Sequence, residues 1–216
     1  MNSGLAALPL SSIKSARSAA AMALREHASL PEITDAPVKI IGMGGNPSSR
    51  QEYKKDTSSY IGIEVTMRFL FLQRERISLL QLASNYGPYL HYLRYYDGME
   101  NVLGIDLAGL AVSYGKSIGS PVEWGDARQI TLPSASWDAV ITHDFLNTKD
   151  FKYPISLVRQ DIHRLLKPNG WHISYGEHMT WTHTERSRPF FSAQQFSDGA
   201  KLDFPELKPV MVFQKA

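Results

Sequence analysis

The sequence predicts an α/β fold in which a doubly wound, mostly parallel sheet carries helices on both faces, with an N-terminal helical extension. Two observations predict this fold. Short apolar strands alternate with helical segments from Ile77 to Tyr175, which is the pattern of right-handed βαβ crossovers. Helix-ending signals separate the segments, with Pro121 before one apolar run and Pro168-Asn169-Gly170 before another.

The chain begins with an Ala-rich segment that is expected to form a surface helix. Ser11-Ser12 supplies favoured N-cap residues, and the helical pattern continues to about His27. The first 25 residues contain basic but no acidic side chains, a composition also found in organelle transit peptides. A surface helix is the preferred interpretation, because Glu26 and the same pattern follow directly.

A glycine-rich stretch, Gly42-Met43-Gly44-Gly45-Asn46-Pro47, follows the first helix and its proline-bracketed connector. A phosphate-binding turn needs a helix that starts at once, so that free N–H groups point at the anion. Here Asn46-Pro47-Ser48-Ser49 indicates another turn, and no Gly-Lys-Ser/Thr follows. A hinge between the extension and the core is therefore the preferred interpretation.

The main domain is expected to start with a helix capped by Thr57, Ser58 or Ser59. One buried face of this helix would carry apolar residues at a spacing near four, namely Ile61, Val65, Phe69 and Leu72. The expected strands and helices then follow as 77–82, 88–96, 101–105, 108–118, 122–124, 137–142, 153–166 and 171–175. A short helix at 192–196 and a last strand at 209–214 complete the pattern. The predicted division is residues 1–56 for the N-terminal helix and connector, which are a candidate lid, and residues 57–216 for the domain.

Composition excludes several classes of protein. The net charge is +2 and no cluster of basic residues occurs, so nucleic acid is not expected as a partner. The absence of cysteine excludes disulfides, thiolate nucleophiles and cysteine-based metal sites, and it fits a cytoplasmic location. No apolar run approaches the roughly 20 residues that a membrane-spanning helix needs, so no membrane partner is expected.

Asp106 is the strongest candidate binding residue. It ends the apolar strand Val102–Ile105 and lies nineteen positions after Gly87 (106 minus 87). A carboxylate at this offset can accept hydrogen bonds from the two hydroxyls of a ribose. Asp is also a favoured N-cap for the helix that follows, and both roles can hold together.

Four sequence segments, in this order, together resemble those of the class I S-adenosylmethionine-dependent methyltransferases. They are the apolar strand and turn from Ile77 to Gly87, Val102-Leu103-Gly104-Ile105-Asp106, Gly125-Asp126-Ala127, and Trp137-Asp138-Ala139-Val140-Ile141-Thr142 with a helix ending at Leu165-Leu166-Lys167-Pro168-Asn169-Gly170. The resemblance implies S-adenosylmethionine as cofactor. It covers about residues 57–176 and the last strand.

The resemblance also implies the residues that hold the cofactor. The family has an acidic residue and three alternate glycines in the first turn, and this chain has Gln81, Ala83, Asn85 and Gly87 there. Gln81 would accept a hydrogen bond from the ammonium group of the methionine moiety, without the strength that a charge adds. The adenosine moiety would lie against the following residues: Asp106 at the ribose, Asp126 at the adenine amino group, and Leu107 and Ala127 along the adenine ring.

His143 and Asp144 follow the fourth strand, where the family places residues that face the transferred methyl group. His143 would thus contact the cofactor and also act as a general base, since its ordinary pKa near 6.5 suits that task. Neighbouring residues of an extended segment point to opposite sides, so Asp144 need not cooperate with it. A histidine that caps the following loop is the alternative.

Two further groups of residues carry weaker hypotheses. Glu177, His178 and His183, with His172, suggest a metal site, but their spacing matches no established ligand pattern, and no metal is expected. Aromatic residues at the two ends of the chain would form a lid over an apolar substrate or, as the preferred interpretation, pack the extension on the sheet: Tyr53, Tyr60, Trp181, Phe190 and Phe191.

The sequence thus predicts methyl transfer from S-adenosylmethionine to an O or N atom of a small molecule. The alternative is a non-catalytic methyltransferase-like scaffold or partner subunit that has lost donor binding, which the substitutions at Gln81, Ala83 and Ser84 favour. A third hypothesis, a different nucleotide such as a dinucleotide, has little room for a pyrophosphate without the glycines. A homodimer or another protein partner is left open.

Overall fold

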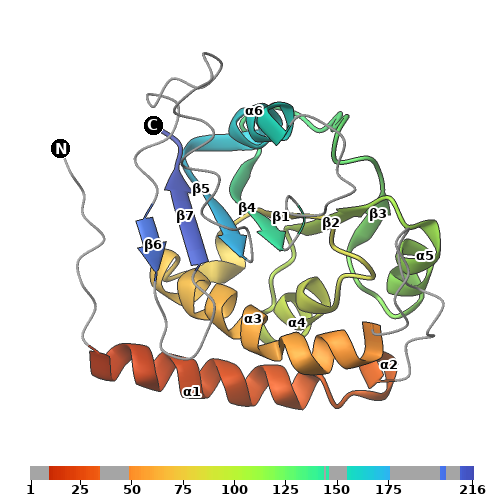
Figure 1. The fold of residues 1–216 in the computed structure, drawn as a ribbon, viewed down its shortest axis with the longest axis vertical. Helices are drawn as coiled ribbons and strands as arrows, with labels where there is room; N and C mark the ends of the chain where they lie inside the picture. Colours follow the sequence, from red (N-terminus) through yellow and green to blue (C-terminus); the bar gives the residue numbers. More distant parts are fainter. Residues whose placement is uncertain (1–9, 35–48, 144, 146–154, 176–199, 203–209) are drawn as a thin grey trace.

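The computed structural model describes residues 10–34, 49–143, 145, 155–175, 200–202 and 210–216. Its centre is a seven-stranded sheet in the order β3-β2-β1-β4-β5-β7-β6 (Figure 1). The strands are β1 Leu79–Leu82, β2 Val102–Asp106, β3 Val122–Trp124, β4 Trp137–His143, β5 Leu166–Tyr175, β6 Ala200–Leu202 and β7 Val210–Gln214. The predicted fold class is confirmed.

The first five strands are parallel, and β7 lies antiparallel between β5 and β6. The predicted last strand is therefore confirmed, whereas β6 was not predicted. The strand order reverses between β1 and β4, which are direct neighbours. In an open sheet of this kind, ligands bind at the carboxyl ends of the strands beside this switch point.

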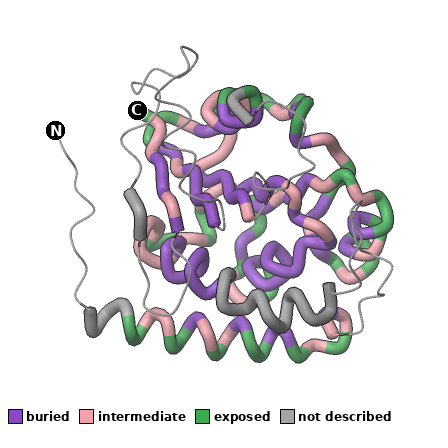
Figure 2. Tube along the Cα trace, viewed as in Figure 1, coloured by how far each residue is buried: buried purple, intermediate pink, exposed green. Residues whose placement is uncertain are grey.

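Helices cover both faces of the sheet, as Figure 1 shows. They are α1 Leu10–His27, α2 Pro31–Thr34, α3 Ser49–Leu70, the 3-10 helix η2 Arg74–Arg76, α4 Pro88–Asp97, α5 Gly109–Ser117 and α6 Ile155–Leu165. Residues of α1, α3, α4 and α5 form one apolar cluster with the sheet. Residues of α6 form a second cluster on the other face, and the strands between the two clusters are buried (Figure 2). None of the described helices is long and apolar enough to cross a membrane.

The first helix of the predicted domain is longer than expected. α3 begins at Ser49 instead of at Thr57–Ser59. The residues before Thr57 are mostly good helix formers, so the helix starts earlier and includes the hydroxyl residues in its interior. Ile61 and Val65 are buried as predicted, but Leu72 is 96% exposed. Leu72 was wrongly placed on the buried face because the helix ends at Leu70. The boundary after residue 56 falls inside this helix and stays a prediction. The glycine-rich stretch from Gly42 to Pro47 lies outside the described residues, as does the short helix predicted at 192–196.

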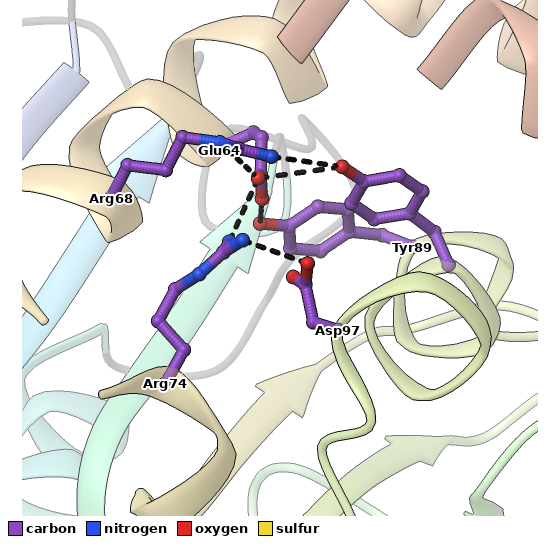
Figure 3. Close-up of polar contacts among 6 residues, drawn as sticks. Glu64, Arg68, Arg74, Tyr89 and Asp97 are labelled. Atoms are coloured by element: carbon purple, nitrogen blue, oxygen red, sulfur yellow. Dashed lines mark hydrogen bonds and ion pairs between the residues drawn. The ribbon is translucent and has the colours of Figure 1, made fainter. Parts of the chain in front are cut away.

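A fully buried carboxylate, Glu64, connects α3 to η2 and α4 (Figure 3). Its Oε1 accepts hydrogen bonds from Arg68 Nε and from an Nη of Arg74, both at 2.7 Å, and its Oε2 accepts one from the Tyr89 hydroxyl at 2.9 Å. Arg74 also forms an ion pair with Asp97 at 2.8 Å, close to the end of α4. Burial, followed by the charge of Glu64, raises the pKa of Asp97 to about 6.

We expect Glu64→Ala to lower the free energy of unfolding by about 3–5 kcal/mol, because it removes the buried carboxylate that pairs with Arg68 and Arg74 and leaves Asp97 as the counter-charge of Arg74 alone. Urea unfolding followed by circular dichroism at pH 7.5 measures this loss. The control is Glu75→Ala, since Glu75 lies at the surface 3.9 Å from Arg76, and it should change stability by about 0.5 kcal/mol or less. Equal losses in the two variants would contradict a structural role for the buried charge.

Candidate active site

The turn after β1 has an unusual backbone that alternates into the left-handed region. Ala83 and Asn85 both have φ +54°, and Gly87 has φ +70°. These are the three positions at which the family that this sequence resembles has glycine. Asn tolerates this conformation, whereas Ala adopts it at a cost of about 1–2 kcal/mol. The turn therefore keeps the backbone path of a glycine-rich turn although only one of the three residues is glycine.

Asp106 holds this turn in place from the end of β2. One carboxylate oxygen accepts the N–H of Asn85 at 2.6 Å, and the other accepts the N–H of Ala108, just before α5, at 2.8 Å. Asp106 ends its strand, as its ribose-binding role requires. It also accepts a backbone N–H at the start of the next helix, as an N-cap residue does. Each carboxylate oxygen can accept a second hydrogen bond, so the pair of hydroxyls of a ribose can still be bound.

Gln81 brings an unpaired acceptor to the carboxyl end of β1. Its side chain is 1% exposed, and its Oε1 has no hydrogen-bond partner among the described residues. A buried carbonyl oxygen without a donor costs about 1–3 kcal/mol. A ligand with an ammonium group would supply the missing donor, so this oxygen fits the methionine end of S-adenosylmethionine.

Ser84, between two of the left-handed residues, points into the sheet side of the turn. Its Oγ is buried and also has no hydrogen-bond partner among the described residues. A Cβ atom on Gly104 of β2 would lie 2.4 Å from this Oγ. Gly104 is therefore required by the close approach of Ser84 to β2, a requirement that a sequence pattern does not reveal.

Asp126 lies in the turn after β3 and is bound to its own neighbour. Arg128 donates from Nε to both carboxylate oxygens at 2.8 Å and from its backbone N–H at 2.9 Å. The hydrogen bonds from the Arg128 side chain lower the pKa of Asp126 against the opposing effect of burial. Its predicted contact with an adenine amino group stays a prediction.

The two residues expected along an adenine ring have different surroundings. Ala127 is buried in the apolar cluster that contains Leu82 and Ile105. Leu107 is 38% exposed, and its carbonyl accepts the indole N–H of Trp124 at 3.1 Å. Leu107 therefore offers an apolar side chain at the surface beside Asp106, and its contact with adenine also stays a prediction.

His143 ends β4 between two tyrosine rings. The Tyr60 ring of α3 lies parallel to it with ring centres 4.8 Å apart, and the Tyr175 ring of β5 lies parallel on the other side at 5.0 Å. The Tyr89 ring stacks on Tyr60 in turn, at 5.0 Å. The stacking on both faces thus fixes the plane of the imidazole ring. Asp144 lies outside the described residues.

Sequence reasoning had considered Tyr60 as a lid or packing residue and had missed Tyr175. The signal for Tyr175 was available, because His143 and Tyr175 are the last residues of neighbouring parallel strands and pair in register. Tyr86 of the turn packs elsewhere, outside this stack of rings. It is 3% exposed and packs edge-on against Tyr114 of α5, with ring centres 5.7 Å apart.

Of the residues considered for a metal, only His172 is described, and it is a core residue. Its Nε2 lies 2.9 Å from the Thr142 hydroxyl, and its ring stacks on Phe213. Burial, followed by the charge of Arg159, lowers the pKa of His172 to about 3. Glu177, His178 and His183 lie outside the described residues, as do the aromatic residues Trp181, Phe190 and Phe191; no side-chain position is described for Tyr53.

Comparisons with known proteins agree with this geometry. The family model described as Methyltransferase domain matches residues 80–174, which run from β1 to the end of β5. A search of curated proteins found no match.

Many solved structures share the fold. The PH0226 protein from Pyrococcus horikoshii OT3 is 19% identical, with 89% of this chain and 99% of that chain covered and a TM-score of 0.57. A chain from a complex of the Haloferax volcanii Trm112 methyltransferase activator with a methyltransferase is 12% identical, with coverages of 76% and 93% and a TM-score of 0.58. A Methanococcus maripaludis protein described as an S-adenosyl-L-methionine-dependent methyltransferase is 11% identical, with coverages of 81% and 98% and a TM-score of 0.54.

We expect Gly87→Ala to destabilise the protein more than a comparable glycine substitution elsewhere. Both Gly87 and Gly98 have left-handed backbones, but a Cβ at 87 would lie 2.5 Å from Val122 Cγ1, whereas a Cβ at 98 would meet nothing within 4 Å. Gly98→Ala should cost about 1 kcal/mol from backbone strain alone, and Gly87→Ala about 2–4 kcal/mol because overpacking adds to it. Chemical denaturation of the two variants side by side measures the difference, and equal costs would contradict the close packing of the turn.

Proposed function

We propose that the chain is a class I S-adenosylmethionine-dependent methyltransferase, which the match of residues 80–174 to the Methyltransferase domain model and the order of the strands support, and that it transfers a methyl group to an O or N atom of a small molecule. One observation carries the proposal. The turn after β1 keeps left-handed backbone at residues 83, 85 and 87, and Asp106 holds it with a carboxylate that retains acceptor capacity. Backbone strain of this kind is concentrated at functional sites, and this supports a ligand-binding role for the turn at Ala83.

Different residues of the chain would bind different parts of the cofactor. Gln81 would accept a hydrogen bond from the ammonium group, Asp106 would accept those of the ribose hydroxyls, and Asp126 would accept that of the adenine amino group. Leu107 and Ala127 would line the adenine ring, while Ala83, Asn85 and Gly87 let the backbone approach the ligand. S-adenosylmethionine, when bound, supplies a methyl group on a positively charged sulfur.

His143 would act as the general base for the methyl acceptor. Its ring lies between Tyr60 and Tyr175 at the carboxyl end of β4, beside the switch point of the sheet, where the reacting groups would meet. The unprotonated ring nitrogen would take the proton from the O–H or N–H of the acceptor as that atom forms its bond to the methyl carbon. Asp144 is the second candidate for this base. Most of the rate enhancement would come from holding donor and acceptor in line.

The proposal includes a small molecule as acceptor, because the net charge of +2 gives little attraction for nucleic acid. It also includes a cytoplasmic location and no membrane partner. The methyltransferase of Haloferax volcanii is solved with an activator protein, and by analogy a protein partner or a second copy of this chain belongs to the proposal as well.

We expect S-adenosylhomocysteine to bind the wild-type protein and Asp106→Asn to weaken this binding about 10- to 100-fold, because hydrogen bonds to a charged group are lost. Isothermal titration calorimetry at pH 7.5 measures both affinities. The control is Asp161→Asn, since Asp161 forms an ion pair with Arg164 on α6, away from the site. If folded wild-type protein binds neither S-adenosylmethionine nor S-adenosylhomocysteine, the proposal is wrong.

We expect Gln81→Glu to bind S-adenosylmethionine about 5- to 10-fold more tightly, because a charged acceptor forms a hydrogen bond roughly twice as strong. The same change should lower the stability of the ligand-free protein, since it buries an unpaired charge. Calorimetric titration and thermal unfolding without ligand measure the two effects. Unchanged affinity would show that residue 81 does not contact the ammonium group.

A non-catalytic scaffold is the second candidate, and the neutral side chain of Gln81 favours it. In that case the protein would no longer bind the donor. Mass spectrometry of denatured, freshly purified protein separates the two candidates. An adenosyl ligand that copurifies excludes the scaffold, and its absence together with negative titrations supports it.

A further inference from the structure

The end of α1 is joined to α4 by two buried histidines that the proposed reaction does not use. His27 Nε2 lies 2.8 Å from His91 Nδ1, and the two side chains are 0% and 8% exposed. The His27 ring also packs edge-on against Tyr92 and Tyr96, with ring centres 5.6 Å and 5.9 Å away. Figure 1 shows α1 running beneath α3 and α4, on the side away from the sheet.

The hydrogen bonds of the pair determine which nitrogen carries each proton. The His91 ring also bonds to the backbone of Ile118, and a ring nitrogen must donate a proton to a backbone carbonyl. His91 Nδ1 is therefore left as the acceptor, and the proton between the rings belongs to His27 Nε2. A chain of hydrogen bonds thus runs from α1 through α4 to the end of α5, and it requires His91 to be neutral.

A second proton on His91 breaks this chain of hydrogen bonds. If His91 Nδ1 took a proton, two N–H groups would face each other across the present 2.8 Å contact. Burial, followed by the charge of His91, lowers the pKa of His27 to about 3. Burial also lowers the pKa of His91, against the opposing charge of Glu32 and the bond to Ile118.

Few charged groups lie against the pair in the described part of the chain. The titratable and charged groups that face it from α1, α2 and α4 are Glu26, Glu32, Tyr92, Tyr95 and Tyr96. Only Glu32 favours the charged form of His91, and its attraction does not outweigh burial. The docked state therefore excludes protons from both rings.

We propose that the His27–His91 pair is an acid-released clasp, which holds α1 and α2 on α4 while both rings are neutral and releases them when the rings take up protons. The direction follows from linkage. Released histidines have an ordinary pKa near 6.5, so acidification below that value favours release. At pH 5 the released His27 ring gains about 30-fold over the docked ring, and His91 shifts the docking equilibrium further in the same direction.

The clasp acts close to the turn after β1. α4 begins directly after Gly87, and the backbone N–H of His91 donates to the Gly87 carbonyl at 2.8 Å. Release would thus free one side of the helix that carries this turn. The inference goes beyond the proposed function and does not require the protein to bind a methyl donor.

Hydrogen exchange of the α1 backbone amides between pH 7.5 and pH 5.0 tests the proposal in the full-length protein. After correction for the intrinsic pH dependence of exchange, the logarithm of the opening constant should rise by between one and two per pH unit well below pH 6.5. Amides of Val140 and Ile141 in β4 report global unfolding, and they should stay protected over the same range. His27→Gln keeps an N–H donor but cannot titrate, so it should reduce the slope by about one.

The matched control is His163→Gln on α6, at the other face of the sheet, and it should keep the wild-type slope. A flat α1 profile in the wild type, or equal slopes in wild type and His27→Gln, overturns the proposal. If His27→Gln does not fold, nuclear magnetic resonance of the wild-type imidazoles decides. Rings that stay neutral at pH 6 while α1 is protected support the clasp, and a ring that titrates near 6.5 with α1 still protected overturns it.

Discussion

The buried charge of Glu64 is the constraint on which the helical face of the molecule depends. A carboxylate that is fully removed from water needs several donors, and Arg68, Arg74 and Tyr89 approach it from three different elements. The same tyrosine that donates to Glu64 stacks on Tyr60, which lies one helical turn before Glu64 and stacks on His143. The charge therefore sets the orientation of α3 relative to α4, and through the rings it sets the position of the imidazole at the end of β4.

The donor turn shows how a backbone path can persist while its side chains change. Alternate left-handed residues are maintained by the carboxylate of Asp106 and by the packing of Gly87 against Val122. Asn85 suits this path, and Ala83 tolerates it at a cost in strain. Function at such a site depends on where the backbone N–H groups and Asp106 lie, so the loss of two glycines does not by itself remove the binding geometry.

Much of the fold could be predicted because parallel strands and their crossover helices leave local signals. The strands around Leu82 and Ile105, the carboxylate of Asp106 and the last strand were all readable from apolar runs and their ends. The start of α3 was misplaced because hydroxyl residues favour caps, yet the helix formers before them continue the helix. β6 was missed because it has three residues and no pattern of its own. The stack around His143 and the burial of Glu64 depend on contacts between distant segments, and no local pattern encodes them.

The contact between Ser84 and Gly104 has an evolutionary consequence. The hydroxyl group fills the space that any larger residue at 104 would occupy, and Leu90 closes the same space at 2.6 Å. The side chain of residue 84 in the turn and any side chain of residue 104 in the neighbouring strand would occupy the same space, so residue 104 cannot gain a side chain while residue 84 stays unchanged. In natural variants of this chain, a side chain at 104 should therefore appear only where the hydroxymethyl group at 84 is lost and the side chain at 90 is smaller or shifted.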